Sequence, residues 1–349
     1  MDKFRVALSS DFLKPDGTPA YPSFDLSPLE ENPNIETAYI PAKTVIDASD
    51  IAGFDALILL SSRFERDSFS HDGRLCLIAR FGVGYDTVDV EACSDHAVAL
   101  VITPDGVRRP VAVSILTLML ALCGKLMQKD RLIRQGPEGW AQRSGHMGAG
   151  LVGKTLGSIG VGNIGAEMFR LAQAFDMDFI AHDPYVDPEV SKSLEVRMVG
   201  LPHLFRESDI LAINCPLSEE THNMVSSDLL SLMKPTAYLI NTARGPIVDQ
   251  KALTEALIAG HIAGAGLDVF SEEPTAVDDP LIKLDNVIVT PHALCWTDQC
   301  FAGIGASDVK AVLEVMHGEE PAYIVNREIL ENAVWRRKLN ANHSKFGPG

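Results

Sequence analysis

The sequence predicts an α/β protein with two doubly wound, mainly parallel sheets, and three observations support this fold class. Short apolar segments of strand length alternate with helix-like segments from end to end, as they do where helices connect parallel strands. The 349 residues suffice for roughly two domains of about 150 residues each. The composition, 46% hydrophobic and 22% charged, is typical of a globular chain.

Five strands are expected in the first third of the chain, where they would form one small doubly wound sheet. They cover residues 6–8, 35–39, 56–60, 76–79 and 97–101. A long helix is expected from about residue 105 to 127, followed by a glycine-rich loop over residues 136–153.

The second series of strands begins at Thr155 and is longer. Its strands cover residues 156–160, 179–182, 210–214, 238–241, 265–269 and 287–290. Six strands joined by helices make a full Rossmann-type, dinucleotide-binding set.

The helical pattern after His292, at residues 309–316, cannot fold alone, so the first domain is expected to be discontinuous. Residues 1–103 and 293–330 would form a flavodoxin-like domain, with residues 104–292 inserted as the Rossmann-type domain. Residues 331–349 are expected to be a tail with a disordered end.

Charge and composition exclude several partners. Thirty Lys and Arg against 47 Asp and Glu give a net charge of −17, spread along the chain. This balance repels nucleic acid and anionic membranes. The longest apolar stretch, residues 111–124, is shorter than the ~20 residues that span a bilayer. No signal peptide and no CxxC pair among six cysteines indicate a cytoplasmic protein without disulfides or structural metal.

The strongest motif is a glycine loop between the strand over 155–159 and a helix over 166–175. It consists of Gly160, Val161, Gly162, Asn163, Ile164 and Gly165. The first glycine permits a tight turn, the second admits a pyrophosphate and the third lets the helix pack on the strand. The pyrophosphate would then lie at a helix N-terminus.

An acid follows the next strand at the expected distance. Asp183 stands 18 residues beyond Gly165, where a carboxylate accepts hydrogen bonds from ribose hydroxyls and repels a 2′-phosphate. The motif therefore predicts NAD rather than NADP. The alternative is a simple glycine turn, with Asp183 opening an Asp-Pro turn to Tyr185.

Three charged residues follow later strands: Arg244, Glu273 and His292. Each has an alternative when taken alone: Arg244 could bind a cofactor phosphate, Glu273 could belong to a solvated turn, and His292 could be structural. Together they suit hydride transfer to a 2-oxo acid, in which a guanidinium grips the carboxylate and histidine protonates the carbonyl oxygen. A carboxylate beside the imidazole favours its protonated form and fixes its tautomer.

Five ordered motifs carry a family resemblance over about residues 50–330. They read GKTLG at 153–157, CPL at 215–217, NTARG at 241–245, GLDVF at 266–270 with Glu273-Pro274, and Pro291-His292. The chain resembles the D-isomer-specific 2-hydroxyacid dehydrogenases, which include glyoxylate/hydroxypyruvate reductases, phosphoglycerate dehydrogenases and D-lactate dehydrogenases.

The resemblance implies roles for these residues. Arg244 would bind the carboxylate, His292 would be the acid and base, and Glu273, which directly precedes a proline, its partner. Contacts to NAD are implied for Cys215, Pro216, Thr221, Thr242, Ala243 and Asp268, with Arg244 and His292 beside the nicotinamide.

A second glycine-flanked turn, residues 80–86, resembles the family's substrate loop. The backbone amides of Val83 and Gly84 would cradle the substrate carboxylate, as a backbone nest does for an anion. The alternative is an ordinary glycine turn. The first domain would accordingly be the substrate-binding one.

Departures from the family pattern leave the substrate open. Ser61 replaces a phosphate-binding Arg of many phosphoglycerate dehydrogenases, although Arg63 would partly compensate. The usual His-x-Gly is absent at His292, and Val113 and Ser114 occupy the region where many members carry Glu. Trp296 lines the substrate pocket or a domain interface. Hydroxypyruvate, glyoxylate and sugar acids therefore rank ahead of phosphoglycerate.

Two other functions stay open: an NAD-sensing binding protein like the corepressors of this fold, and another NAD-linked hydride-transfer enzyme such as a formate or phosphite dehydrogenase. A homodimer is expected through the apolar helix 111–122 and the loop 136–150 with Trp140.

Overall fold

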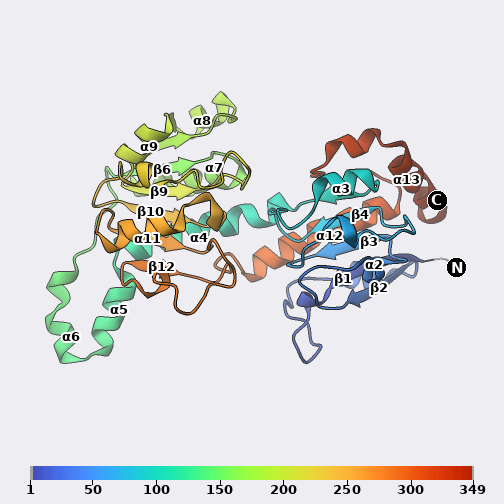
Figure 1. The fold of residues 1–349 in the computed structure, drawn as a ribbon, viewed down its shortest axis with the longest axis horizontal. Coiled ribbons are helices and arrows are strands. Elements are labelled where there is room, and N and C mark those ends of the chain that lie inside the picture. The colour runs from blue at the N-terminus through green and yellow to red at the C-terminus, as the bar shows by residue number, and fades with distance from the viewer. Residues whose placement is uncertain (1–2, 348–349) are drawn as a thin grey trace. The chain divides into compact units, whose positions relative to one another are not determined.

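A computed structural model describes residues 3–347, and the chain divides into two compact units. The first unit combines Met1–Val107 with Trp296–Gly349, and the second is Arg108–Cys295. The first segment of the first unit was expected to end at residue 103 and ends at 107. Its second segment was expected to begin at residue 293 and begins at 296. Both units are parallel sheets with helices on their faces (Figure 1).

The first unit contains a five-stranded sheet in the order β2-β1-β3-β4-β5. The strands are β1 (Phe4–Ser9), β2 (Ile35–Ile40), β3 (Ala56–Leu59), β4 (Leu77–Arg80) and β5 (Ala99–Val101). All five were predicted. β3 is apolar and buried at every position, as expected for a parallel strand covered on both faces.

The second unit contains a seven-stranded parallel sheet in the order β12-β11-β10-β9-β6-β7-β8. Its strands are β6 (Thr155–Ile159), β7 (Asp178–His182), β8 (Arg197–Met198), β9 (Ile210–Ile213), β10 (Tyr238–Asn241), β11 (Gly264–Leu267) and β12 (Val287–Val289). The six predicted strands are present, and only the two-residue β8 was missed. The strand order reverses between β6 and β9, which is where ligands bind in such sheets.

Helices connect the strands and are often capped by a side chain at their first turn. They are α1 (Ser27–Glu30), α2 (Ala48–Ile51), α3 (Val90–Asp95), α4 (Pro104–Cys123), α5 (Leu126–Arg134), α6 (Pro137–Ala141), α7 (Asn163–Ala172), α8 (Pro188–Ser193), α9 (Leu201–Glu207), α10 (Ser227–Leu230), α11 (Gln250–Ile258), α12 (Asp298–Met316) and α13 (Ala333–Phe346). Asp89 and Asp249, for example, accept the amide three residues on, satisfying one of the orphan donors of the helix.

α4 is the one helix in the described part of the chain that is long and apolar enough to cross a membrane. However, 61% of its apolar window is buried, and Ile115, Met119 and Leu122 pack in a core cluster with Phe169. α4 is therefore a core helix. It ends at Cys123 rather than near residue 127, because Lys125 adopts a left-handed backbone (φ 51°) that interrupts the helix.

The region predicted as a glycine-rich loop, residues 136–153, contains regular structure. α6 and a 3₁₀ helix (Arg143–His146) occupy half of it. A Cβ on Gly139 would lie 1.9 Å from the carbonyl oxygen of Leu132, so this glycine lets α6 pack against α5. The two helices form a hairpin, which we call the arm, beside the sheet of the second unit (Figure 1).

The predicted tail is also wrong, because residues 333–346 form α13. Trp335 is fully buried, and its Nε1 donates to the carbonyl of Cys76 at 3.0 Å. Lys338 Nζ donates to the carbonyls of Leu75 (2.7 Å) and Ala97 (2.9 Å). Lys338 is half-buried, so its aliphatic stem packs against the unit while its ammonium binds backbone just before β4 and β5.

Candidate active site

The glycine loop has the shape that a dinucleotide needs. Gly160 has φ +96°, and a Cβ there would lie 2.8 Å from the carbonyl oxygen of Asn214, so a larger residue is excluded. A Cβ on Gly162 would meet nothing within 4 Å, and no side chain caps α7, which starts at the next residue. The N-terminal amides of α7 therefore face open space suited to an anion. The first turn of α7 contains the predicted Asn163, Ile164 and Gly165.

Asp183 lies just beyond β7, with its carboxylate fixed beside this loop. Oδ2 accepts the amide of Val161 at 2.8 Å, and Oδ1 accepts the amide of Tyr185 at 2.9 Å. The structure therefore contains the Asp-Pro turn that the sequence offered as an alternative. Each oxygen of Asp183 can still accept a second hydrogen bond, for example from a ribose hydroxyl.

The loops after β9 and β10 carry other predicted cofactor residues. Thr221 Oγ1 donates to the carbonyl of Pro216 at 2.7 Å and accepts the amide of Ser218 at 2.8 Å, so this hydroxyl shapes its own loop. Burial raises the pKa of the Cys215 thiol to about 11, which keeps it neutral. Thr242 Oγ1 is buried with no hydrogen-bond partner among the described residues. Such an orphaned hydroxyl at the carboxyl edge of the sheet fits a ligand contact.

Glu273 and His292 form a hydrogen-bonded pair at the same edge. The imidazole Nδ1 lies 2.7 Å from Glu273 Oε2, and Oε1 accepts the amide of Phe270 at 2.9 Å. Burial alone would raise the pKa of Glu273, but the bond and charge of His292, the Phe270 amide and the charge of Arg244 together lower it. An ionised Glu273 requires a proton on Nδ1, which leaves Nε2 for the reacting oxygen.

The backbone of His292 is left-handed, with φ +54°, and the buried Asp268 anchors it on both sides. Asp268 Oδ1 accepts the hydroxyl of Thr290 (2.6 Å) before the histidine, and the amides of Ala293 (3.0 Å) and Leu294 (3.2 Å) after it. A left-handed non-glycine residue costs of order 1–3 kcal/mol, and these bonds hold it. Asp268, predicted as a cofactor contact, thus positions the loop that contains His292.

Arg244 follows β10 and is held by a residue that sequence reasoning missed. The buried Asn241 donates from Nδ2 to the carbonyl of Arg244 at 2.9 Å and accepts the amide of Ala243 at 3.0 Å. A Cβ on Gly245 would lie 1.9 Å from the carbonyl carbon of Phe270. This glycine therefore lets the arginine loop approach the glutamate loop. A polar residue ending a buried strand was the available signal for Asn241.

The predicted carboxylate cradle lies in the first unit, after β4. Gly82 donates its amide to Thr103 Oγ1 at 2.9 Å, and the Thr103 amide donates to the Gly82 carbonyl at 3.0 Å. Among the described residues, the amides of Val83 and Gly84 make no hydrogen bond, so both can bind an anion.

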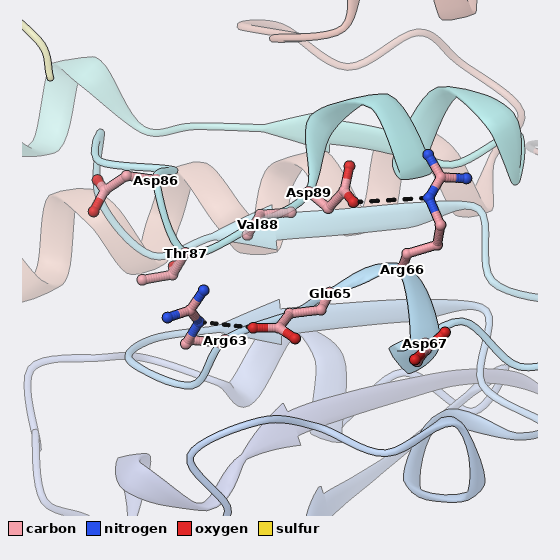
Figure 2. A pocket seen from close by; sticks show the side chains of 8 residues that line it. All are labelled: Arg63, Glu65, Arg66, Asp67, Asp86, Thr87, Val88 and Asp89. Carbon is pink, nitrogen blue, oxygen red and sulfur yellow. Dashed lines mark ion pairs between the residues drawn. The ribbon is translucent and has the colours of Figure 1, made fainter. Parts of the chain in front are cut away.

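A charged pocket of about 490 Å³ lies beside this turn, at the ends of β3 and β4 (Figure 2). It is lined by Arg63, Glu65, Arg66, Asp67, Asp86, Thr87, Val88 and Asp89. Arg63 pairs with Glu65 at 3.0 Å, and Arg66 with Asp89 at 4.0 Å. Four carboxylates surround two guanidiniums here, so the lining of this pocket carries a net negative charge. That Arg63 partly compensates for Ser61 stays a prediction.

Residues 116–293 match the model of the D-isomer specific 2-hydroxyacid dehydrogenase NAD-binding domain. The chain is 36% identical to a glyoxylate reductase of Korarchaeum cryptofilum, over 83% of this chain and 88% of that one. It is also 36% identical to a D-3-phosphoglycerate dehydrogenase of Methanocaldococcus jannaschii, over 85% and 56% respectively. The chain belongs to the D-isomer-specific 2-hydroxyacid dehydrogenase family.

Solved structures agree on the fold. The TT0316 protein of Thermus thermophilus superimposes with a TM-score of 0.79 at 30% identity, covering 92% of this chain and 99% of the other. A glyoxylate reductase of Paecilomyes thermophila gives a TM-score of 0.80 at 23% identity, covering 94% and 100%, which bears on the fold alone. The protein is thus an NAD-dependent oxidoreductase that acts on 2-hydroxy acids and 2-oxo acids.

Proposed function

We propose that the protein reduces a 2-oxo acid without a phosphate group to the D-2-hydroxy acid, with glyoxylate and hydroxypyruvate as the first substrates to test. The observation that carries the proposal is the Glu273–His292 pair, 2.7 Å apart at the carboxyl edge of the second sheet. The fixed imidazole is a proton donor for a carbonyl oxygen.

Each charged group has a separate role. In the second unit, the Arg244 guanidinium is the group that binds a substrate carboxylate. In the first unit, the amides of Val83 and Gly84 offer an anion two donors. His292 Nε2 protonates the carbonyl oxygen, and Glu273 stabilises the imidazolium that precedes this step. When bound, NADH supplies the hydride. Asp183 and the amides at the start of α7 hold the adenosine ribose and the pyrophosphate.

Substrate preference follows from the absence of spare positive charge. Ser61 provides no cation, and both guanidiniums of the pocket in Figure 2 already pair with carboxylates. A phosphorylated substrate would leave its dianion beside four acidic side chains, so phosphoglycerate is disfavoured.

We also propose a cytoplasmic homodimer formed through the arm. The arm carries several exposed apolar residues: Leu126 (59% exposed), Met127 (42%), Ile133 (54%) and Trp140 (57%). Exposed apolar side chains gathered on one segment favour an interface. Buried free thiols at Cys76, Cys93 and Cys123 support a reducing compartment.

Turnover of NADH with a panel of 2-oxo acids tests the function. Reduction of glyoxylate or hydroxypyruvate at one or more turnovers per second is expected, since enzymes commonly reach roughly 1–10³ s⁻¹. Binding of NADH without turnover of any 2-oxo acid would identify an NAD-sensing protein instead. Oxidation of formate or phosphite alone would identify another hydride-transfer enzyme.

A further inference from the structure

Six aromatic side chains of the first unit form one continuous cluster: Phe12, Tyr21, Phe24, Phe81, Trp296 and Phe301. The ring centroid of Phe81 lies 5.0 Å from Phe12, 4.9 Å from Phe24 and 5.4 Å from Phe301. These four phenylalanines are buried, so packing accounts for them.

Tyr21 and Trp296 lie at the outer edge of the cluster, and we call these two side chains the aromatic wall. Tyr21 stacks on Phe301 with centroids 4.1 Å apart, and Trp296 meets both rings edge-on at 5.4 Å. Trp296 is nevertheless 45% exposed. The three rings contact one another, so the indole of Trp296 is held in place while much of its apolar surface faces solvent. A fixed, exposed aromatic surface is better suited to binding a ligand than to core packing.

The aromatic wall adjoins the edge of the sheet that carries the carboxylate cradle. β1 pairs in parallel with β3, and β3 with β4, so their carboxyl ends meet at one edge. Ser61, after β3, donates its amide to Asp11 Oδ2 at 2.8 Å, which ties the segment after β1 to this edge. Phe81, to which the wall is packed through Phe301, directly precedes the cradle turn.

The wall is uncharged. Burial, with a smaller contribution from the charge of Asp11, raises the pKa of the Tyr21 phenol, so it stays protonated at neutral pH. An aromatic surface without charge favours contact with an apolar or aromatic group.

We infer that the aromatic wall selects 2-oxo acids that carry an apolar or aromatic substituent on the carbon next to the oxo group. The inference rests on the proposed function, because the wall acts on a substrate whose carboxylate the cradle holds. Glyoxylate shares the carboxylate and the oxo group of such a substrate but offers nothing to the wall.

The test compares kcat/KM for phenylpyruvate and for glyoxylate, with NADH, in the full-length protein. Wild type should prefer phenylpyruvate, and Trp296→Leu should lower the phenylpyruvate-to-glyoxylate ratio at least about tenfold, the scale of a lost apolar contact. Trp296→Phe should keep the ratio within about threefold, since a ring remains. Tyr39→Leu, 39% exposed on β2, is the matched control and should leave both constants unaltered.

Glyoxylate turnover with no preference for phenylpyruvate, or a Trp296→Leu ratio equal to that of wild type, overturns the inference and leaves the proposed function standing. Failure of wild type to reduce any 2-oxo acid overturns the proposed function itself. The Trp296→Phe variant keeps the test decisive if Trp296→Leu disturbs folding. A tenfold fall of the phenylpyruvate-to-glyoxylate ratio in Trp296→Phe as well would contradict recognition by an aromatic ring.

Discussion

His292 has a left-handed backbone conformation, and in this conformation its imidazole binds Glu273. The conformation is held by Asp268, whose carboxylate binds residues on both sides of the histidine. The chemistry of this histidine therefore depends on two acids with different tasks: Glu273 fixes the proton on Nδ1, and Asp268 fixes the loop.

The rate of reduction should reveal the Glu273 charge. Because the pKa of Glu273 is lowered below 4.5, the carboxylate is ionised throughout the neutral range and accepts the proton on Nδ1 of His292. Glu273→Gln should reduce kcat, because a neutral amide carries no charge to balance the imidazole when it holds both protons. Values of kcat/KM between pH 5 and 9, at saturating NADH, measure this loss, and turnover equal to that of wild type across this range would contradict the assignment.

Asp183 should decide between the two nicotinamide dinucleotides. Its carboxylate, fixed by the amides of Val161 and Tyr185, would repel a 2′-phosphate. Asp183→Ser should therefore raise the kcat/KM ratio of NADPH to NADH by at least about tenfold, equivalent to about 1.4 kcal/mol. Asp187→Ser, at the start of α8, is the control, and an unaltered ratio in Asp183→Ser would refute the role.

At the scale of elements, α13 is the helix that the sequence pattern did not predict. The strands were predictable because parallel strands buried on both faces are continuous apolar runs. α13 is polar along most of its length and is fastened by single residues, Trp335 and Lys338, to segments more than 200 positions away. Local patterns carry no information on such contacts. Asn241 differs, because its partners Ala243 and Arg244 are neighbours in the chain and a polar residue at the end of a buried strand signalled it.

Removing the indole of Trp335 should destabilise the first unit. The side chain is fully buried and donates one hydrogen bond, and truncation of such a residue costs about 3–5 kcal/mol. Urea denaturation of Trp335→Ala should show this loss, whereas Arg337→Ala, exposed on the same helix, should stay within about 0.5 kcal/mol of wild type. Equal midpoints for the two variants would mean that α13 does not hold the sheet.

At the scale of the whole molecule, a chain of net charge −17 has to capture an anionic dinucleotide and an anionic substrate. The positive potential is local: the open N-terminus of α7, the guanidinium of Arg244 and two backbone amides of the cradle. The glycine motif and strand-end charges made most of this site predictable. The ion pairs that neutralise Arg63 and Arg66 were not, because they depend on which acids the fold brings together.

The arm should mediate dimer formation. Trp140→Glu combined with Ile133→Glu places two charges on its exposed apolar face and should convert a dimer into a monomer of 37.8 kDa. Light scattering measures the mass. Val277→Glu, a change at a more exposed valine (86%) outside the arm, should keep the dimer, and a wild-type monomer would refute the proposal.

The most direct test of the central claim is the reduction of 2-oxo acids by His292→Ala. Loss of the proton donor should lower kcat by about 10²–10⁴-fold, while the Kd for NADH, measured by fluorescence, stays within about threefold because the glycine loop and Asp183 supply most of the binding. His261→Ala, an exposed histidine of the same unit, should behave as wild type. Undiminished turnover in His292→Ala would contradict the account.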